Sequence, residues 1–162
     1  MKTTKKYLFL TNNSDGLYGF RHELLSALAK RGEIFISTPN DGFFDELHAL
    51  GCTVIDTPLD RRGINPLTDV KLFRQYRRLL RQIQPDMVIT YTIKPNVYGG
   101  LACRLAGIPY AANITGLGTA FQKPGVLRTV ASILYKIALK RAKVVFFENG
   151  ENQQTLLDAH IV

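Results

Sequence analysis

The sequence is poor in the residues that build metal centres, disulfides and membrane spans. It has no tryptophan, only two cysteines and no long apolar run. The first apolar segment, 7–10, is too short for a signal peptide or a membrane-spanning helix. Cys52 and Cys103 have no metal-ligand pattern beside them. We therefore expect reduced thiols in a cytoplasmic protein and no metal site.

Catalytic bases and cofactor fingerprints are also scarce. Of the three histidines, His22 lies nearest the expected ligand edge, His48 falls on a surface helix and His160 is close to the last residue. No Ser-His-Asp arrangement can be built from the motifs. The first turn, 13–19, carries glycines without the Gly-x-Gly-x-x-Gly spacing of dinucleotide-binding proteins. The sequence therefore predicts neither an obvious catalytic base nor a bound cofactor.

What is present is a regular alternation of short apolar strands and amphipathic helices. With 162 residues, 46% of them hydrophobic, the chain can form one domain with a sizeable core. Strands are expected at 7–11, 34–37, 53–55, 87–90, 109–114 and 144–147, and helices at 20–30, 41–50, 67–83, 95–106, 125–142 and 151–159. The alternation predicts an α/β fold with a doubly wound, Rossmann-like parallel sheet in the strand order 3-2-1-4-5-6.

The stretch 86–121 is the centre of this arrangement, a strand, a helix and a second strand followed by a glycine-punctuated loop. The polar segments 91–96 and 113–119 follow its two strands, where ligands collect in open parallel sheets. The turn 13–19 follows the first strand. Its glycines before a helix fit either a phosphate site or a plain structural turn. We expect all three segments to meet at one edge of the sheet.

The formal net charge of +8 is unevenly placed. Residues 61–83 hold seven basic residues against one acid, and residues 122–143 hold six against none. On the predicted helix 67–83, an apolar face lies opposite a basic stripe made of Lys71, Arg74, Arg78 and Arg81. This stripe fits a solvated helix face or attraction to anionic lipid headgroups. Nucleic acid is disfavoured, because no aromatic residues interleave with the basic ones on that face.

Four segments carry a resemblance to a known family: 12–21 (NNSDGLYGFR), 91–99 (YTIKPNVYG), 108–121 (IPYAANITGLGTAF) and 146–152 (FFENGEN). Through them the chain resembles the N-terminal domain of bacterial glycosyltransferases of the glycosyltransferase 4-like group, which share the GT-B fold. It looks closest to those that build capsular, exopolysaccharide or lipid-linked glycans. The similarity covers essentially the whole chain.

The resemblance implies a site between two Rossmann-like domains, of which the N-terminal one mainly holds the acceptor and the C-terminal one grips the nucleotide-sugar. It places Gly16 and Gly19 against the donor diphosphate. It also brings seven residues to the cleft: Lys94, Asn96, Tyr98, Asn113, Thr115, Gly116 and Gly118. Thr115 stands where many relatives have histidine, so no catalytic residue is carried over. The Glu-x7-Glu segment of the family's donor domain is not in this chain.

The hypothesis from the sequence is the acceptor-side half of a retaining glycosyltransferase. It would transfer a sugar from a nucleotide-sugar to a glycan or polyprenyl-diphosphate-linked acceptor in the cytoplasm, at the inner face of the plasma membrane. The donor-binding domain would be supplied in the same or a separate chain. One alternative is a half of a sugar-nucleotide 2-epimerase, which should need acids and histidines in its cleft. Another is a non-catalytic binding module, which should tolerate changes in the glycine loops.

Overall fold

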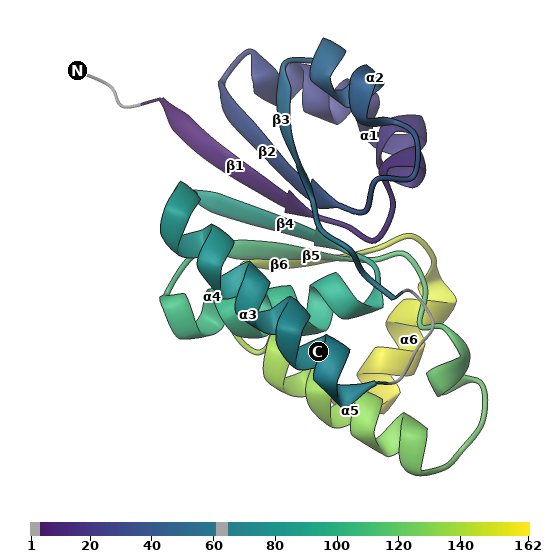
Figure 1. Cartoon of the computed structure of the whole chain (residues 1–162). Helices are drawn as coiled ribbons and strands as arrows, with labels where there is room; N and C mark the ends of the chain where they lie inside the picture. Colours follow the sequence, from purple (N-terminus) through teal and green to yellow (C-terminus); the bar gives the residue numbers. More distant parts are fainter. Residues whose placement is uncertain (1–3, 61–64) are drawn as a thin grey trace.

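The computed structural model describes residues 4–60 and 65–162, which form a six-stranded sheet in which every strand pairs in parallel with its neighbours (Figure 1). The strand order is β3-β2-β1-β4-β5-β6. The strands are β1 (Lys5–Leu10), β2 (Gly32–Thr38), β3 (Cys52–Asp56), β4 (Met87–Tyr91), β5 (Tyr110–Ile114) and β6 (Val144–Phe147). The order reverses between β1 and β4, as predicted for a doubly wound sheet.

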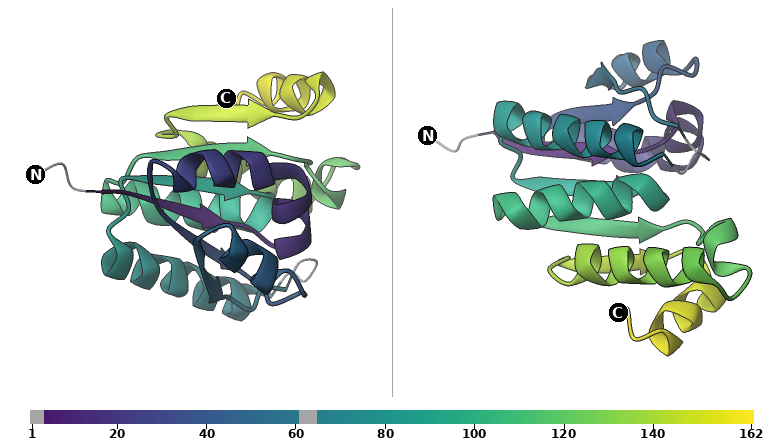
Figure 2. Two further views of the ribbon diagram at one scale, coloured as in Figure 1. Left: turned by 90° about the horizontal axis from the view of Figure 1, so that it is seen from above. Right: turned by 60° about the horizontal axis from the view of Figure 1, so that its bottom comes forward.

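Helices cover both faces of this sheet (Figure 2). One face carries α1 (Ser14–Ala29) and α2 (Phe44–Ala49), which pack on β2 and β3 respectively. The other carries α3 (Pro66–Ile83), α4 (Gly100–Ala106) and α5 (Val126–Leu139), side by side. Two short turns, the π-helical η1 (Pro95–Gly99) and the 3₁₀-helical η2 (Thr119–Phe121), and the final helix α6 (Gly150–Asp158) complete the described chain.

The core explains why the second half of β1 is continuously apolar. Successive side chains of a strand point to opposite faces, so Leu8 and Leu10 pack beneath α3 and α4 while Phe9 packs beneath α1 and α2. All three are completely buried. A strand buried on both faces needs a continuous apolar run, as expected for the middle of a parallel sheet.

The first helix begins earlier than the sequence pattern predicted. The expected loop over 12–19 is wrong, because α1 starts at Ser14 rather than Phe20. Its N-terminus is capped from a distant segment: Asp41 accepts hydrogen bonds from the backbone N–H of Ser14 (2.9 Å) and from the Ser14 hydroxyl. Because Gly16 and Gly19 are weak helix formers, the local sequence did not indicate that a helix begins at Ser14.

The phase of α1 also differs from the expectation. Its buried face is formed by Ser14, Leu17 and Leu25. For a helix over 20–30, the sequence pattern predicts that Phe20, Leu24, Leu25 and Leu28 face the core, but Phe20 and Leu24 are 79% and 41% exposed. The expected interior position of these two side chains is therefore wrong, and Phe20 is left at the edge of the sheet, free to contact a ligand or a partner surface.

Two further observations concern membrane-spanning helices and the two cysteines. Within residues 4–60 and 65–162, no helix is both long and apolar enough to cross a membrane. Cys52 and Cys103 are buried free thiols, and burial raises their pKa values to about 11 and about 12. Both therefore stay protonated near neutral pH and are poor nucleophiles. Arg61 and Arg62, two of the seven basic residues between 61 and 83, lie outside the described part of the chain.

Candidate functional site

Two adjoining pockets lie at the carboxyl ends of β1, β4 and β5. The first has a cavity volume of about 210 Å³ and the second about 220 Å³. They share Thr92, which follows β4, and Thr115, which follows β5. Asn12 and Asn13, which follow β1, contribute one to each pocket. The three predicted segments therefore do meet at one edge of the sheet.

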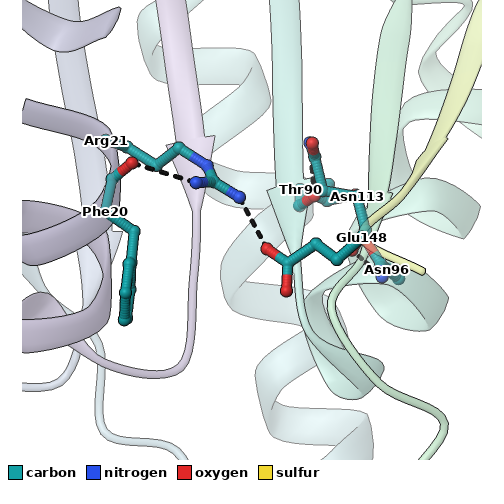
Figure 3. A network of polar contacts seen from close by, with 6 residues as sticks. All are labelled: Phe20, Arg21, Thr90, Asn96, Asn113 and Glu148. Atoms are coloured by element: carbon teal, nitrogen blue, oxygen red, sulfur yellow. Dashed lines mark hydrogen bonds and ion pairs between the residues drawn. The ribbon is translucent and has the colours of Figure 1, made fainter. Parts of the chain in front are cut away.

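An ion pair forms one wall of the first pocket (Figure 3). The Arg21 guanidinium donates to Glu148 at 2.6 Å and to the Phe20 carbonyl oxygen at 2.9 Å. It also lies 5.5 Å from the centre of the Tyr91 ring. Arg21 comes from α1 and Glu148 from the end of β6, so the pair links the two halves of the sheet across its switch point. The pocket thus contains a positive charge that is held beside a carboxylate.

The second pocket contains a cation of a different kind. Lys94 lines it together with Gly116 and Gly118. Its ammonium group lies 2.7 Å from Asp69 of α3, and the Tyr98 hydroxyl donates to the same carboxylate at 2.9 Å. Burial, followed by the hydrogen bond and charge of Asp69, raises the pKa of Tyr98, so its phenol stays neutral. Asp69 therefore fixes the position of Lys94 and offsets its charge.

Asn96 and Asn113 form a buried hydrogen-bond network with Thr90 (Figure 3). The Thr90 hydroxyl donates to Asn96 Oδ1 at 2.6 Å, and Asn96 Nδ2 donates to the Asn113 carbonyl oxygen at 2.8 Å. Asn113 Nδ2 donates in turn to the Thr90 carbonyl oxygen at 3.2 Å. Asn96 is 0% exposed and Asn113 is 9% exposed. In this structure both amides hold β4, η1 and β5 together, and direct contact with a ligand stays a prediction.

The two shared threonines differ in their backbone strain. Thr92 has φ +70°, a left-handed conformation that costs a non-glycine residue of order 1 kcal/mol or more. Its hydroxyl is buried and lacks a hydrogen-bond partner among the described residues. Thr115 is half-buried and faces both pockets. Strain and an unpaired hydroxyl at one point of the edge mark the Thr92 position as a site where a bound group would gain a partner.

The four predicted glycines differ in their surroundings. Gly16 lines the first pocket, in the first turn of α1, whereas Gly19 is exposed and lines neither pocket. Gly116 has open space around its Cβ position, with no atom within 4 Å. Gly118 has φ +63°, and a Cβ there would lie 2.7 Å from Ile93 Cδ1. A Cβ at Gly16 would lie 2.8 Å from Asn13 Nδ2, so of the glycines that line a pocket only Gly116 has both an ordinary φ and open space for a side chain.

Three residues of the site were missed by the sequence interpretation. Arg21 and Glu148 lie in segments that carry the family resemblance, but their pairing spans 127 positions and has no local signal. Asp69 did have a signal, since it is the single acid between residues 61 and 83. An acid in the first turn of a helix is also favoured by the helix dipole, so this signal did not identify its partner, Lys94.

The remaining predicted groups lie away from the pockets. His22 is exposed, and its ring nitrogen lies 3.2 Å from the Tyr18 carbonyl oxygen one turn back along α1. Among the described residues, no cluster of three or more histidine, cysteine or acidic side chains could hold a metal ion. The basic residues of α3 are exposed on its outer side. The chemistry available at the edge is therefore hydrogen bonding by threonines and electrostatic binding by Arg21 and Lys94.

Comparison with known proteins gives this geometry a context. A family model described as "Glycosyl transferase 4-like" matches residues 6–149. A curated relative from Campylobacter jejuni, N,N'-diacetylbacillosaminyl-diphospho-undecaprenol alpha-1,3-N-acetylgalactosaminyltransferase, is 32% identical over 152 residues. The match covers 90% of this chain but 40% of the relative, so the chain spans less than half of that protein.

Solved structures share the fold at lower sequence identity. A glycosyltransferase from Rickettsia africae superposes with a TM-score of 0.68 at 16% identity, covering 96% of this chain and 40% of that one. The Anabaena protein HepE in complex with UDP-glucose gives 0.65 at 19% identity, covering 95% and 40%. A Listeria monocytogenes structure described as a putative UDP-N-acetylglucosamine 2-epimerase gives 0.63 at 14%, covering 97% and 43%. At these identities the similarity shows the fold alone.

Proposed function

This chain belongs to the glycosyl transferase 4-like family, and from that premise we propose that it is the acceptor-side half of a retaining glycosyltransferase. The proposed donor is a nucleotide-sugar, and the proposed acceptor is a lipid-linked glycan. The Campylobacter relative, named for transfer to an undecaprenol-linked substrate, supports the acceptor class. The Anabaena complex with UDP-glucose supports the donor class.

The observation that carries the proposal is the pair of adjoining pockets at the switch point. Complete ligand sites usually enclose about 300–1,000 Å³. Each pocket here is smaller, about 210 and 220 Å³, and the two open at the same edge of the sheet. Half of a cleft that a second domain closes would have this form. Each pocket also contains one cation, Arg21 or Lys94, which suits a site that handles diphosphate groups.

We assign the donor diphosphate to the first pocket, with Gly16 and Arg21, and the acceptor to the second, with Lys94, Thr115 and Gly116. During transfer the bond between the sugar C1 and the diphosphate oxygen breaks. A bond from the acceptor oxygen forms at C1, and the acceptor proton leaves with the diphosphate. A cation facing the departing diphosphate stabilises the charge that develops there. Arg21 can meet that charge once Glu148 moves away from it.

Retention is proposed from the linkage in the relative's name. That name specifies an α-1,3 product. Nucleotide-linked N-acetylhexosamines carry their sugar in α linkage, so an α product keeps the configuration at C1. The same outcome is proposed for this chain, with the donor sugar itself left open.

The Listeria structure shows that the 2-epimerase alternative shares this fold. The choice between sugar transfer and epimerisation therefore rests on the residues of the site. Among the described residues, the two pockets contain one acid, Glu148, and no histidine. That acid is already paired with Arg21. This favours transfer, in which positioning and charge stabilisation carry most of the rate. A non-catalytic binding module would not require a cation in each pocket.

The test is a transfer assay with a labelled nucleotide-sugar and a polyprenyl-diphosphate-linked acceptor. The 162-residue chain alone should be inactive, because its half of the cleft leaves the donor in water. Addition of a donor-side domain, fused or as a separate chain, should produce acceptor-dependent release of the nucleoside diphosphate. Epimerisation of the nucleotide-sugar without an acceptor would instead support the epimerase.

Gly116→Val in the restored enzyme should lower the transfer rate at least tenfold, since the new side chain enters the second pocket. Gly19→Ala is the matched control, because Gly19 also has open space at its Cβ position but lines neither pocket. Full activity of Gly116→Val would remove the acceptor from this pocket.

A further inference from the structure

A third pocket lies between α3 and the loop that follows β3. Its volume is about 480 Å³, more than twice that of either pocket at the switch point. Leu59 and Lys94 line both this pocket and the second one, so the two adjoin. α3 begins near the end of the sheet to which the strands point, and the third pocket therefore belongs to the same edge as the other two (Figure 1). Its volume is within the range of complete small-molecule sites, about 300–1,000 Å³.

The charged side chains of this pocket balance one another. Its described lining holds two lysines and two aspartates, which give a formal charge of zero: Lys71, Lys94, Asp60 and Asp69. The second pocket, over the same described part of the chain, has Lys94 and no acid. In the third pocket, repulsion by two carboxylates would offset what an anionic group gains from two ammonium groups. The balance favours a neutral ligand.

An ion pair is fixed where the third pocket meets the second. Lys94 Nζ lies 2.7 Å from Asp69 Oδ1, and the Tyr98 hydroxyl donates to Asp69 Oδ2 at 2.9 Å. The side chains of Lys94 and Asp69 are each 14% exposed. A carboxylate oxygen has two lone pairs and an ammonium group has three N–H donors, so both groups keep hydrogen-bonding capacity for a ligand. The wall thus offers an acceptor and a donor at fixed positions.

Gln75 supplies a neutral polar group from the middle of α3. Its Nε2 donates to Thr57 Oγ1 at 3.3 Å, and the Thr57 hydroxyl oxygen lies 2.7 Å from that of Ser37. Thr57 and Ser37 are buried, so this chain of hydrogen bonds holds the amide in place. The amide has a second N–H and a carbonyl oxygen that can serve a ligand. Apolar surface beside these polar groups comes from Pro58, Leu59 and Leu72.

We propose that the third pocket binds a neutral sugar of the acceptor, a hexose or an N-acetylhexosamine. A pyranose ring carries hydroxyl groups that both donate and accept hydrogen bonds, and its faces are formed by C–H groups. The hydroxyls pair with Asp69, Lys94 and Gln75, and one face of the ring lies on the leucine side chains. Such a ligand is uncharged, in agreement with the balanced lining.

This inference rests on the proposed function and makes its acceptor more specific. The reacting hydroxyl lies in the second pocket, at the switch point, and the third pocket holds the next sugar along the glycan. The acceptor therefore has at least two sugars before any phosphate, because a diphosphate in the third pocket would lie beside two carboxylates. α3 and the loop after β3 then determine which glycans are accepted.

Nuclear magnetic resonance titration of the 162-residue chain tests the binding step without a donor. The probes are the methyl glycosides of glucose, galactose, N-acetylglucosamine and N-acetylgalactosamine, the disaccharides lactose and N,N'-diacetylchitobiose, and pyrophosphate as the anionic comparison. At least one sugar should shift the side-chain amide signals of Gln75 and the backbone signals of Lys71 and Leu72. A disaccharide that shifts these signals should also shift that of Gly116, in the second pocket, whereas pyrophosphate should leave Gln75 unmoved.

Gln75→Leu shows whether the amide makes the contact. The variant should weaken binding of that sugar about fivefold, the loss expected for one hydrogen bond. Thr57 keeps its bond to Ser37, so the urea midpoint should stay close to that of the wild type. Gln82→Leu is the matched control, exposed on the same helix and outside the three pockets, and should leave binding unchanged. In the restored enzyme, Gln75→Leu should raise the KM for a glycan acceptor about fivefold, while kcat and the KM for the nucleotide-sugar stay the same.

Two results would overturn the inference: no shift of the Gln75 signals by any of the sugars, or larger shifts by pyrophosphate than by every sugar. Transfer that Gln75→Leu leaves unaffected, or an equal KM for one-sugar and two-sugar acceptors, would remove the acceptor from the third pocket and leave the proposed function intact. Sugar binding that Gln75→Leu weakens, in a restored enzyme that epimerises the nucleotide-sugar and transfers nothing, would refute the proposed function and keep the third pocket as a sugar site.

Discussion

Replacing Asn96 with alanine should destabilise the fold by about 3 kcal/mol. Asn96 is completely buried, so no water can take over its hydrogen bonds. The substitution removes the donor to the Asn113 carbonyl oxygen and the close acceptor of the Thr90 hydroxyl, which keeps only the Ala111 carbonyl oxygen at 3.4 Å. A buried polar group left without its partner costs roughly 1–3 kcal/mol, and two groups are affected here. In a chain of this length, that loss lowers the melting temperature by about 10 °C.

Urea unfolding followed by far-ultraviolet circular dichroism measures this loss. The midpoint should fall while the slope of free energy against urea stays the same, because the fold itself is unchanged. Asn40→Ala, at an exposed position, is the control and should change stability by less than about 0.5 kcal/mol. If Asn96→Ala matches this control, the Thr90–Asn96–Asn113 network does not hold β4, η1 and β5 together.

Three further predictions follow from the site and the core. Asp69→Asn should lower the free energy of unfolding by about 2 kcal/mol, since Lys94 and Asp69 are both only 14% exposed. Glu148→Gln should lower it by under about 1 kcal/mol, because Glu148 is 46% exposed. The midpoints of urea unfolding of the two variants measure both losses. Cys52 and Cys103 should react with a thiol reagent at pH 8 only after urea unfolds the chain, and rapid reaction of the native protein would contradict their burial. Burial raises the pKa values of Tyr76 and Tyr98, so at high pH the native state keeps protons that the unfolded state loses. The stability from these two groups should therefore be fully present below about pH 10 and fall as the pH rises further. Denaturation midpoints measured across that pH range will check this.

The fold was predictable because its signals are local and repeated. Each strand is a short apolar run, and each helix has an apolar face at helical spacing. The rule that connects parallel strands then limits the strand order to few choices. The order 3-2-1-4-5-6 and the placement of 91–96 and 113–119 at one edge follow from these signals alone. Both predictions are confirmed by the structure.

What the sequence could not supply is contact between distant segments. The start of α1 depends on Asp41, which lies 27 positions from Ser14 and caps the helix from the loop after β2. The pairing of Arg21 with Glu148 likewise crosses the whole sheet. The burial of Asn96 depends on the π-helical shape of η1 and on Thr90, and polar residue type alone suggested exposure to the cleft. Each miss therefore comes from tertiary structure overriding a local signal.

The central claim is that the two pockets at the carboxyl edge of β1, β4 and β5 are the ligand-binding half of a glycosyltransferase cleft. Nuclear magnetic resonance titration of the amide signals tests it most directly, with UDP-glucose and a short-chain polyprenyl-diphosphate glycan added separately. The account predicts shifts by UDP-glucose near Gly16, Arg21 and Glu148, and shifts by the glycan near Lys94 and Gly116. Shifts confined to α2 or α6, with these amides unmoved, would contradict it.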